Sequence, residues 1–422
     1  MDRNTKLKNI LSTFVSAYSK FDNNIIVHSK EVAFLTLSIC NALSIDEIKK
    51  KDIMVAAYLH DIAASRTNLL DSLKKFDTVE YHAHCIYGYV FFDTFMPCNN
   101  FSKYILYHHE PFNSKNIINN IEIPIESNIL KIADDISIFK LTDNDITIDK
   151  IREFLLSRKD LYNPIYLDIF LSNYGDEILK KLLDKSYLEY LADYGDEILI
   201  NNTDFVTLVE AMAFVLDFKC EITTMHSQTV SLFSVLLAKE FDLPDIFEIR
   251  VGSLLHDIGK LAIPDSILKK PSSLTPEEFE VMKKHVEYTY EILSNLKNEK
   301  ILKIASNHHE KLNGQGYPKG ISDLSFQERL VSVADIFAAL TQKRSYKNGY
   351  SKEKTIEILR NCANNCEIDT CIVNKVIEKY DYFIDMNFEL NENYSNKINL
   401  LKDKYNTLSS YNELINFKIN PT

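Results

Sequence analysis

The segment Leu254-Leu255-His256-Asp257-Ile258-Gly259-Lys260 decides the fold and the chemistry that this sequence predicts. It places an imidazole directly before a carboxylate at the end of an apolar run. Such a pair can share a metal site, in which the imidazole binds one ion and the carboxylate bridges two. A single His-Asp pair is also typical of a capped helix end, so the prediction depends on the ligands that follow. These lie on separate predicted helices: His285, His308, His309 and Asp335.

The length and composition indicate a globular protein. The 422 residues exceed one ordinary core and suit about two domains of roughly 200 residues each. Hydrophobic residues make up 45% and charged residues 26%, and no apolar run approaches the ~20 residues needed to span a bilayer. The charged N-terminus, Met1 to Lys8, has no secretory signal pattern. We therefore expect a cytoplasmic protein that has no membrane segment.

The net charge of -12 argues against a general nucleic-acid binder, because such proteins carry a basic stripe. We expect no direct DNA binding. An anionic substrate is compatible with this charge if metal ions and a few cations reverse the field inside the site.

The seven cysteines are scattered and include no Cys-x-x-Cys pair. The pattern favours reduced, buried thiols over a cysteine metal site, including for the last three. The seven are Cys40, Cys85, Cys98, Cys220, Cys362, Cys366 and Cys371.

Apolar residues recur at three- and four-residue spacing along nearly the whole chain, which predicts an all-α fold. Val32, Leu35 and Ile39 are one example. The segment Thr275-Pro276-Glu277-Glu278 predicts a helix start with a capping box. We expect His285 two turns further along that helix.

The chain also repeats itself at an offset near 200 residues. The repeat follows five groups in the same order: His28 and His226, His60-Asp61 and His256-Asp257, His84 and His285, His108-His109 and His308-His309, Asp134 and Asp335. We interpret the chain as two copies of one helical module. The predicted boundaries are residues 1–145 for the first domain, 146–205 for a helical connecting segment, and 206–422 for the second domain with its tail. The amphipathic tail, residues 381–422, is interpreted either as a final packed helix or as a surface for homodimer formation.

Imidazoles and carboxylates together suit first-row divalent ions such as iron, manganese, nickel or zinc. In the second copy, one ion could be held by His226, His256, Asp257 and Asp335. A second ion could be held by Asp257, His285, His308 and His309. Two ions bridged by Asp257 would lie ~3.5–4 Å apart, polarise a phosphoryl oxygen and hold a shared water as hydroxide. This arrangement predicts hydrolysis of a phosphate ester. Glu310 is expected to orient an imidazole from outside the ligand set.

Two motifs carry a family resemblance. They are His256-Asp257-Ile258-Gly259-Lys260 and His308-His309-Glu310-Lys311-Leu312-Asn313-Gly314-Gln315-Gly316-Tyr317-Pro318. Together with Ala334 to Thr341 and Arg344, they resemble the HD-GYP branch of the HD phosphohydrolase superfamily. The resemblance covers about Cys220 to Ser351, and the first copy resembles an HD domain only.

The resemblance implies an all-α fold of two tandem HD-type domains and a metal-dependent phosphodiesterase of bacterial second-messenger signalling. Its expected substrate is a cyclic dinucleotide, with cyclic di-GMP first and cyclic GMP-AMP second, cut to the linear dinucleotide and in some members to mononucleotides. The expected catalytic residues are Asp257 and Lys260. The resemblance places six residues at the substrate: Lys260, Gly316, Tyr317, Pro318, Arg344 and Lys347. Solvated surface is an equal alternative for Lys347.

Departures from the family pattern refine these expectations. Ile222 stands where members with three metals carry a glutamate, so we expect two ions, iron or manganese before nickel or zinc. In the first copy Ala63 and Ala64 replace the glycine and lysine of the motif, and no Gly-Tyr-Pro loop follows. We expect metal there without efficient turnover, in a regulatory or structural role. The ligands of this second metal site would be His28, His60, Asp61, His84, His108, His109 and Asp134.

Two other functions remain open at this stage. One is a nucleotidase, or another HD phosphohydrolase, that acts on a different phosphate ester. The other is a receptor that binds a cyclic dinucleotide without cleaving it. Substrate comparison with purified protein separates both from the phosphodiesterase.

Overall fold

The computed structural model describes residues 5–20, 23–61, 81–96, 99–143, 145–194, 199–219, 225–342 and 349–419. The described regular elements are helices apart from two short strands, and the predicted all-α fold is confirmed. Two short strands, β1 (Thr5–Lys6) and β2 (Leu199–Ile200), pair with each other. No helix in these ranges is long and apolar enough to cross a membrane.

The chain divides into two compact units. The larger part of one is Phe21–Leu199, which we call the first module, and the larger part of the other is Ile200–Asn396, which we call the second module. Helix α1 (Leu7–Tyr18) and the final helix α22 (Tyr380–Ile419) contribute residues to both units. The tail is therefore helical, and its part in homodimer formation stays a prediction.

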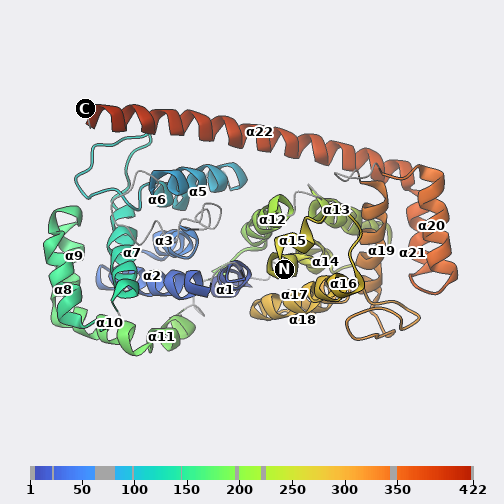
Figure 1. Cartoon of the computed structure of the whole chain (residues 1–422), viewed down its shortest axis with the longest axis horizontal. Coiled ribbons are helices and arrows are strands. Elements are labelled where there is room, and N and C mark those ends of the chain that lie inside the picture. The colour runs from blue at the N-terminus through green and yellow to red at the C-terminus, as the bar shows by residue number, and fades with distance from the viewer. Residues whose placement is uncertain are drawn as a thin grey trace. The chain divides into compact units, whose positions relative to one another are not determined.

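The first module consists of nine described α-helices and one 3-10 turn, with α2 packed against both α3 and α7 (Figure 1). Their bounds are α2 (Asn23–Ala42), α3 (Glu47–Leu59), α5 (Tyr81–Phe95), α6 (Phe101–Leu106), α7 (Ser127–Thr142), α8 (Ile148–Ser157), η2 (Lys159–Leu161), α9 (Pro164–Leu171), α10 (Asn173–Asp184) and α11 (Tyr187–Tyr194).

In the second module, α13 packs against α14 and α19, and α18 packs against α14 and α17. The bounds are α12 (Asn202–Lys219), α13 (His226–Glu240), α14 (Ile246–Leu255), η3 (Ile258–Ala262), α15 (Asp265–Leu268), α16 (Pro276–Lys283), α17 (His285–Leu293), η4 (Ser294–Leu296), α18 (Glu299–Ser306), α19 (Phe326–Thr341), α20 (Lys352–Asn364) and α21 (Thr370–Glu378).

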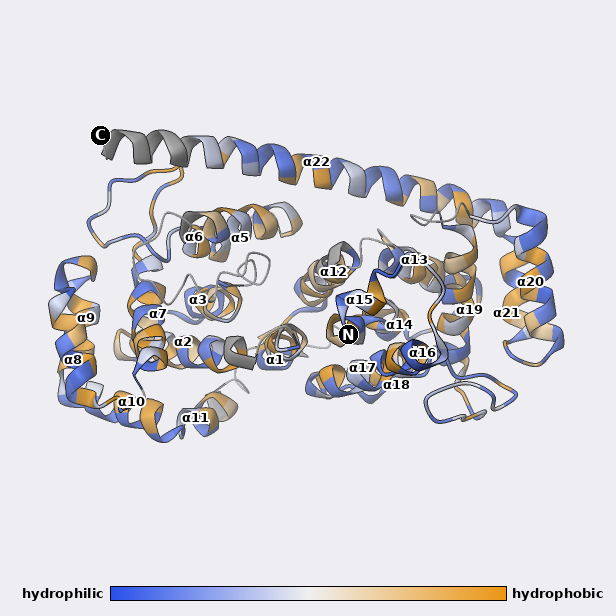
Figure 2. Cartoon of the chain, in the orientation of Figure 1, coloured by the Kyte–Doolittle hydropathy of each residue, from blue (hydrophilic) through white to orange (hydrophobic). Residues whose placement is uncertain are grey.

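Amphipathic sequence and capping side chains explain why these segments are helical. Figure 2 shows hydrophobic and hydrophilic residues on the same helices, as in α20 and α21. The hydrophobic sides of the helices form the core of the second module, where the rings of Phe233 and Phe337 lie 4.7 Å apart. Thr275 and Glu278 form the predicted capping box at the start of α16. Such a cap contributes roughly 1 kcal/mol to helix stability.

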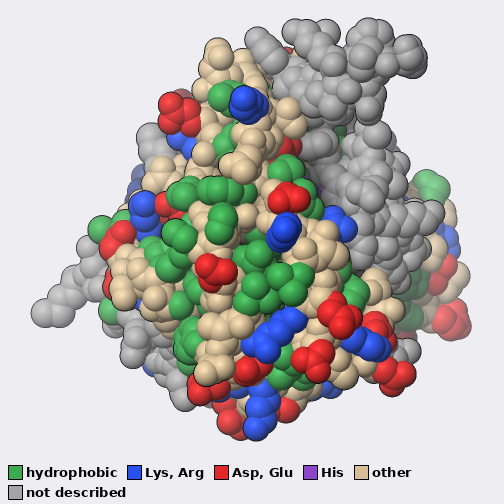
Figure 3. Space-filling model, turned by 90° about the vertical axis from the view of Figure 1, so that its left-hand side faces the viewer, with side chains coloured by type: hydrophobic (Ala, Val, Ile, Leu, Met, Phe, Trp, Pro, Cys, Tyr) green, Lys and Arg blue, Asp and Glu red, His purple; other side chains and the backbone are tan. Residues whose placement is uncertain are grey.

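One face of the molecule, seen in Figure 3, carries acidic and basic side chains interspersed with hydrophobic ones. No histidine is visible there among the residues that the structure describes. The metal-type side chains are instead buried inside the modules, including His60, His108 and His256, which are 0% exposed.

The predicted repeat is confirmed at the level of helices. Five helices of each module carry or precede the paired residues in the same order: α2 and α13, α3 and α14, α5 and α17, α6 and α18, α7 and α19. In each module the His-Asp pair directly follows the second of these helices. The same order of helices therefore delivers the same residue types to one point in each module.

Three details of the sequence prediction are wrong. His285 does not lie within the helix that Thr275 caps, because α16 ends at Lys283 and His285 begins α17. His308 and His309 lie in the turn after α18 rather than on a helix. Of the last three cysteines none is buried: Cys362 is half-buried, and Cys366 and Cys371 are exposed near the ends of α20 and α21.

Candidate metal centres

Five elements of the second module bring all seven predicted metal ligands into one buried cluster. His226 Nε2 lies 2.9 Å from Asp335 Oδ1, and His256 Nε2 lies 3.2 Å from Asp257 Oδ2. His285, His308 and His309 form a further group whose candidate ligand atoms all lie within 4.8 Å of one another. We call these seven residues the second-module cluster.

Asp257 occupies the middle of this cluster. Its Oδ2 faces His256 at 3.2 Å, while its Oδ1 lies 3.3 Å from His285 Nε2 and 3.8 Å from His308 Nε2. The two oxygens of one carboxylate therefore face two different groups of imidazoles. This is the arrangement required of a bridging ligand.

Backbone carbonyls orient three of the imidazoles. His256, His285 and His308 each donate from Nδ1 to the carbonyl three residues earlier, those of Ser253, Met282 and Ala305, all at 2.7 Å. Because Nδ1 is used in this bond, Nε2 is the ring nitrogen that faces the cluster.

The prediction that Glu310 orients an imidazole stays a prediction. Its carboxylate accepts backbone hydrogen bonds from Lys319 at 2.8 Å and from Ile321 at 3.1 Å. Glu310 is buried and ties down the loop that follows His309.

Several buried nitrogen and oxygen atoms of the cluster form no hydrogen bond. These atoms show whether the residues fit a metal ion. His256 Nε2, His285 Nε2, His308 Nε2 and Asp257 Oδ1 are buried and form no hydrogen bond. Leaving a polar group buried and unsatisfied costs about 1–3 kcal/mol each. A divalent cation would satisfy all four at once, and nitrogen with carboxylate oxygen is a donor set for first-row transition metals. The residues fit the metal that the sequence predicted.

The electrostatics of the cluster agree with this fit. Burial raises the pKa of Asp257, but the charges of Lys260 and His256 outweigh it and hold that pKa well below its usual value. Burial lowers the pKa of His256, but Asp257 outweighs burial and raises it to about 9. Burial lowers the pKa of His309 to about 3. The carboxylate of Asp257 stays ionised, and the neighbouring His256 binds a proton more readily than usual. Both shifts show that the cluster favours positive charge, as a metal-ion site does.

Lys260 is the nearest described cation to the bridging carboxylate. Its Nζ forms a short ion pair with Asp257 Oδ2, and its side chain is partly exposed. Gly259, one residue earlier, packs so closely against α17 that an added Cβ would lie 1.9 Å from the carbonyl oxygen of His285. Only glycine fits between the His-Asp pair and α17, and this close approach positions Lys260.

The Gly316-Tyr317-Pro318 loop folds back onto the cluster. The ring of Tyr317 lies 4.7 Å from the ring of His309, and the Tyr317 backbone N–H donates to the His309 carbonyl at 3.2 Å. A Cβ on Gly316 would lie 2.4 Å from the Lys311 backbone nitrogen, so a glycine is required there. The loop forms one wall beside the cluster. Arg344 and Lys347, predicted at the substrate, lie outside the described residues.

The first module brings its seven predicted ligands together in the same way. His28 Nε2 lies 3.2 Å from both His60 Nε2 and Asp134 Oδ1, and Asp61 Oδ1 lies 3.6 Å from His84 Nε2. His60 and His108 donate from Nδ1 to the carbonyls of Ala57 and Ile105. We call this group, with His109, the first-module cluster.

Comparison with known proteins gives the family. The sequence pattern of the HD domain matches residues 25–138 and again residues 210–372, which together make up more than half of the chain. The chain belongs to the HD-domain family. Each matched segment holds one of the two clusters, so the chain carries two HD domains in tandem.

Curated relatives of these HD domains are cyclic-dinucleotide phosphodiesterases by name. A segment of 184 residues, 42% of the chain, is 38% identical to 3'3'-cGAMP-specific phosphodiesterase 2 of Vibrio cholerae and 37% identical to a cyclic di-GMP phosphodiesterase of Thermotoga maritima. These matches span 35% and 49% of the two relatives, so the chain covers less than half of either. A third relative, 3'3'-cGAMP-specific phosphodiesterase 1 of V. cholerae, matches at 24% identity over 85% of this chain and 88% of its own length.

A solved structure supports the fold of the tandem HD domains. The crystal structure of a cyclic GMP-AMP-specific phosphodiesterase of V. cholerae covers 90% of this chain and 98% of its own, with a TM-score of 0.56 and 18% identity. At that identity the likeness establishes the fold alone.

The sequence prediction missed residues that support the HD ligands. His226 Nδ1 lies 2.9 Å from Gln342 Oε1, and His28 Nδ1 lies 3.0 Å from Ser137 Oγ. Gln342 follows Asp335 by seven residues and Ser137 follows Asp134 by three, so helical spacing from the ligand aspartates was a usable signal. Cys85, which directly follows the ligand His84, was also missed as a member of the first-module cluster.

Proposed function

We propose that this chain is a metal-dependent phosphodiesterase that hydrolyses a cyclic dinucleotide, with catalysis in the second HD domain. The position of Asp257 supports this most directly, because its two oxygens face two groups of imidazoles whose Nε2 atoms are buried and unsatisfied. The relatives named as cyclic di-GMP and 3'3'-cGAMP phosphodiesterases supply the substrate class.

Two ions are proposed, iron or manganese before nickel or zinc. One would be held by His226, His256, Asp257 and Asp335, and the other by Asp257, His285, His308 and His309. When bound, such ions activate water and polarise a phosphoryl oxygen.

The residues of the chain supply the rest of the mechanism. The reaction forms one P–O bond to the oxygen of water and breaks one P–O ester bond, and the departing sugar oxygen takes up a proton. Lys260 is the cation placed to stabilise negative charge that develops on the phosphoryl group. Asp257 remains ionised throughout, because its pKa is held far below neutral. Tyr317, whose ring already lies against His309, would form the wall of the nucleotide pocket together with Gly316 and Pro318.

A dianionic substrate is compatible with the acidic chain. The net charge of -12 belongs to the whole surface, whereas the site would present two divalent cations and Lys260 to the phosphates. Electrostatic attraction would then act locally, over less than the ~8 Å screening length of physiological salt.

The test uses the full chain, purified without oxygen and supplied with Fe²⁺ or Mn²⁺. Hydrolysis of cyclic di-GMP and of cyclic GMP-AMP is followed by chromatography of the linear and mononucleotide products. The chain offers a matched pair of variants, Asp257→Ala in the second cluster and Asp61→Ala at the corresponding position of the first. We expect Asp257→Ala to abolish turnover and Asp61→Ala to retain it.

Other results would redirect the assignment. Turnover that survives in Asp257→Ala and is lost in Asp61→Ala would place catalysis in the first HD domain. A protein that holds two ions and binds the nucleotide tightly without forming product would be a receptor. Turnover of other phosphate esters alone would identify a different phosphohydrolase.

A further inference from the structure

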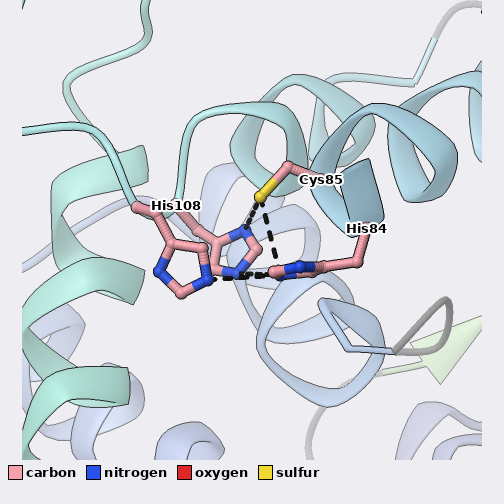
Figure 4. Close-up of side chains that lie close together, drawn as sticks. His84, Cys85 and His108 are labelled. Carbon is pink, nitrogen blue, oxygen red and sulfur yellow. Dashed lines mark hydrogen bonds between the residues drawn. The ribbon is translucent and has the colours of Figure 1, made fainter. Parts of the chain in front are cut away.

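The first-module cluster contains a thiol that has no counterpart in the second. Cys85 lies on α5 directly after His84, and its side chain is 1% exposed. Its Sγ lies 3.6 Å from His84 Nε2 and 3.6 Å from His108 Nδ1 (Figure 4). The thiol therefore points at the imidazoles of the cluster rather than into the hydrophobic core.

The four candidate donor atoms of this cluster all lie within 4.8 Å of one another, and the three separations that involve His84 Nε2 have the spacing of a tetrahedral site. His84 Nε2 lies 3.3 Å from His108 Nε2 and 3.2 Å from His109 Nε2. Tetrahedral zinc with Zn–N bonds of 2.0–2.1 Å requires nitrogen atoms about 3.3 Å apart, and a nitrogen and a sulfur about 3.6 Å apart. The observed separations around His84 match both values.

A second, independent feature points to a cation here. Asp61 is buried, its Oδ1 forms no hydrogen bond, and this oxygen lies 3.6 Å from His84 Nε2. Both oxygens of Asp134 are also buried without a hydrogen bond, and Oδ2 lies 3.5 Å from His109 Nδ1. Two ionised carboxylates at the edge of the four donors leave negative charge that a cation would balance.

The second HD domain has no thiol at the position that corresponds to Cys85. His285 corresponds to His84, and the residue that follows it is Val286, which is 1% exposed and offers no donor atom. The second cluster therefore has three imidazoles where the first has three imidazoles and a thiol. In the second HD domain the position of the thiol is therefore left without a protein ligand, and catalytic metal sites keep such an open position for water or substrate, whereas structural sites are closed by protein ligands.

We propose that the first HD domain binds a thiophilic divalent ion, Zn²⁺ before others, through His84, Cys85, His108 and His109. The Cys85 thiolate occupies the position on this ion that the second HD domain leaves without a protein ligand. The site thus joins α5 to the turn after α6 and holds the first HD domain together without contributing to hydrolysis. The inference is independent of the function proposed for the second domain.

Binding exchanges a proton for the metal ion. Burial, with Asp61, Glu110 and Asp134 nearby, keeps the pKa of the metal-free Cys85 thiol well above its usual value, so the free thiol is protonated. The incoming cation bonds to sulfur and releases one proton to water for each ion bound, since a coordinating thiol is deprotonated outright. No electron is transferred.

Cobalt substitution tests the thiolate directly. The full chain is stripped with a chelator and titrated with Co²⁺ under anaerobic conditions, and the near-ultraviolet band of thiolate-to-cobalt charge transfer is recorded. The matched variant is Cys85→Val, which gives the first cluster the side chain found at Val286. Cys40→Val is the control, because Cys40 is a buried free thiol that belongs to none of the candidate ligand groups.

We expect the band in the wild-type chain and in Cys40→Val, and its loss in Cys85→Val. Cys85→Ser is the second variant, since it preserves the size of the side chain and supplies no sulfur. It should also lose the band. Its helical circular dichroism should be retained, which shows that the variant is folded. A band that persists undiminished in folded Cys85→Ser or Cys85→Val would overturn the proposal. So would a wild-type chain that binds Co²⁺ and shows no such band.

Discussion

The side-chain amide oxygen of Gln342 lies 2.9 Å from Nδ1 of His226, the first candidate ligand of the second HD domain. The same amide donates from Nε2 to the Thr229 hydroxyl at 2.7 Å, which fixes the direction of its oxygen. His226 therefore donates from Nδ1 and directs Nε2 toward Asp335. One residue at the end of α19 sets the tautomer of a ligand at the start of α13.

Replacing Gln342 by Leu should weaken metal binding in this domain. Loss of a partner that orients a ligand commonly costs about 10–100-fold in metal affinity or activity. Metal affinity measured by competition with a chelator checks this. Gln327→Leu is the control, because Gln327 lies on the same helix and donates to Asp245, away from the cluster. Equal loss in both variants would show a general effect on α19.

Glu310 should control the Gly-Tyr-Pro loop rather than the metal. In Glu310→Ala the Lys319 and Ile321 N–H groups lose their acceptor, and each bond to a charged group contributes about 1.5–3 kcal/mol. We expect KM for the cyclic dinucleotide to rise while the metal content stays near that of the wild type. Glu310→Gln, which keeps one acceptor oxygen, should lie between the two. Metal loss in Glu310→Ala would show that Glu310 acts on the ligands after all.

Thr289 links the His-Asp segment to α17. Its hydroxyl donates to the His256 carbonyl and accepts from the Gly259 N–H, both at 3.0 Å, and the residue is 0% exposed. Thr289→Val has the same shape and leaves both backbone groups unsatisfied, so it should lower the free energy of unfolding by about 1–3 kcal/mol per group. Chemical denaturation of the full chain measures this. Thr289→Ser keeps the hydroxyl and should lose much less; equal losses would contradict the hydrogen-bond explanation.

Gly259→Ala should disrupt the second HD domain. The added methyl group would meet the His285 carbonyl oxygen at 1.9 Å and the Thr289 nitrogen at 2.6 Å, and both are backbone atoms that cannot rotate away. Overpacking of this kind costs about 1–3 kcal/mol and sometimes more. We expect a lower melting temperature and loss of hydrolysis, measured by calorimetry and product formation. A variant with wild-type melting and turnover would show that α17 can move.

Asp217 should make stability depend on pH. It accepts hydrogen bonds from the backbone N–H and the hydroxyl of Ser227, and burial raises its pKa to about 6. Since the unfolded carboxyl ionises near 3.9, the unfolded chain loses this proton first as pH rises. Asp217 therefore lowers stability progressively between about pH 4 and pH 6, and the full penalty, up to about 3 kcal/mol, remains above that range.

The isosteric variant Asp217→Asn removes this ionisation and keeps the oxygen that accepts both bonds. In chelator-treated protein we expect the variant to melt higher than the wild type at pH 7.5, with the difference shrinking toward pH 5. A constant difference across that range would show that Asp217 does not titrate there.

The sequence by itself determined the helical class and the two modules, and it predicted both sets of seven candidate ligands. Helical spacing of apolar residues is a local property, and five ordered pairs of ligands survive in the linear sequence regardless of how the chain folds. The capping box at Thr275 was predictable for the same reason, because its two hydrogen bonds join residues three apart.

Tertiary structure alone decided how the ligands are held and how the two sites differ. Gln342 contacts His226 across 116 residues of sequence, Glu310 accepts hydrogen bonds from the loop at Lys319, and the carbonyls of Ser253, Met282 and Ala305 orient three imidazoles. In sequence Cys85 is one scattered cysteine, and only the packing of α5 against the turn after α6 brings its sulfur to His84 and His108. Which donor atoms share a buried space depends on contacts between distant segments, and those contacts exist only in the folded chain.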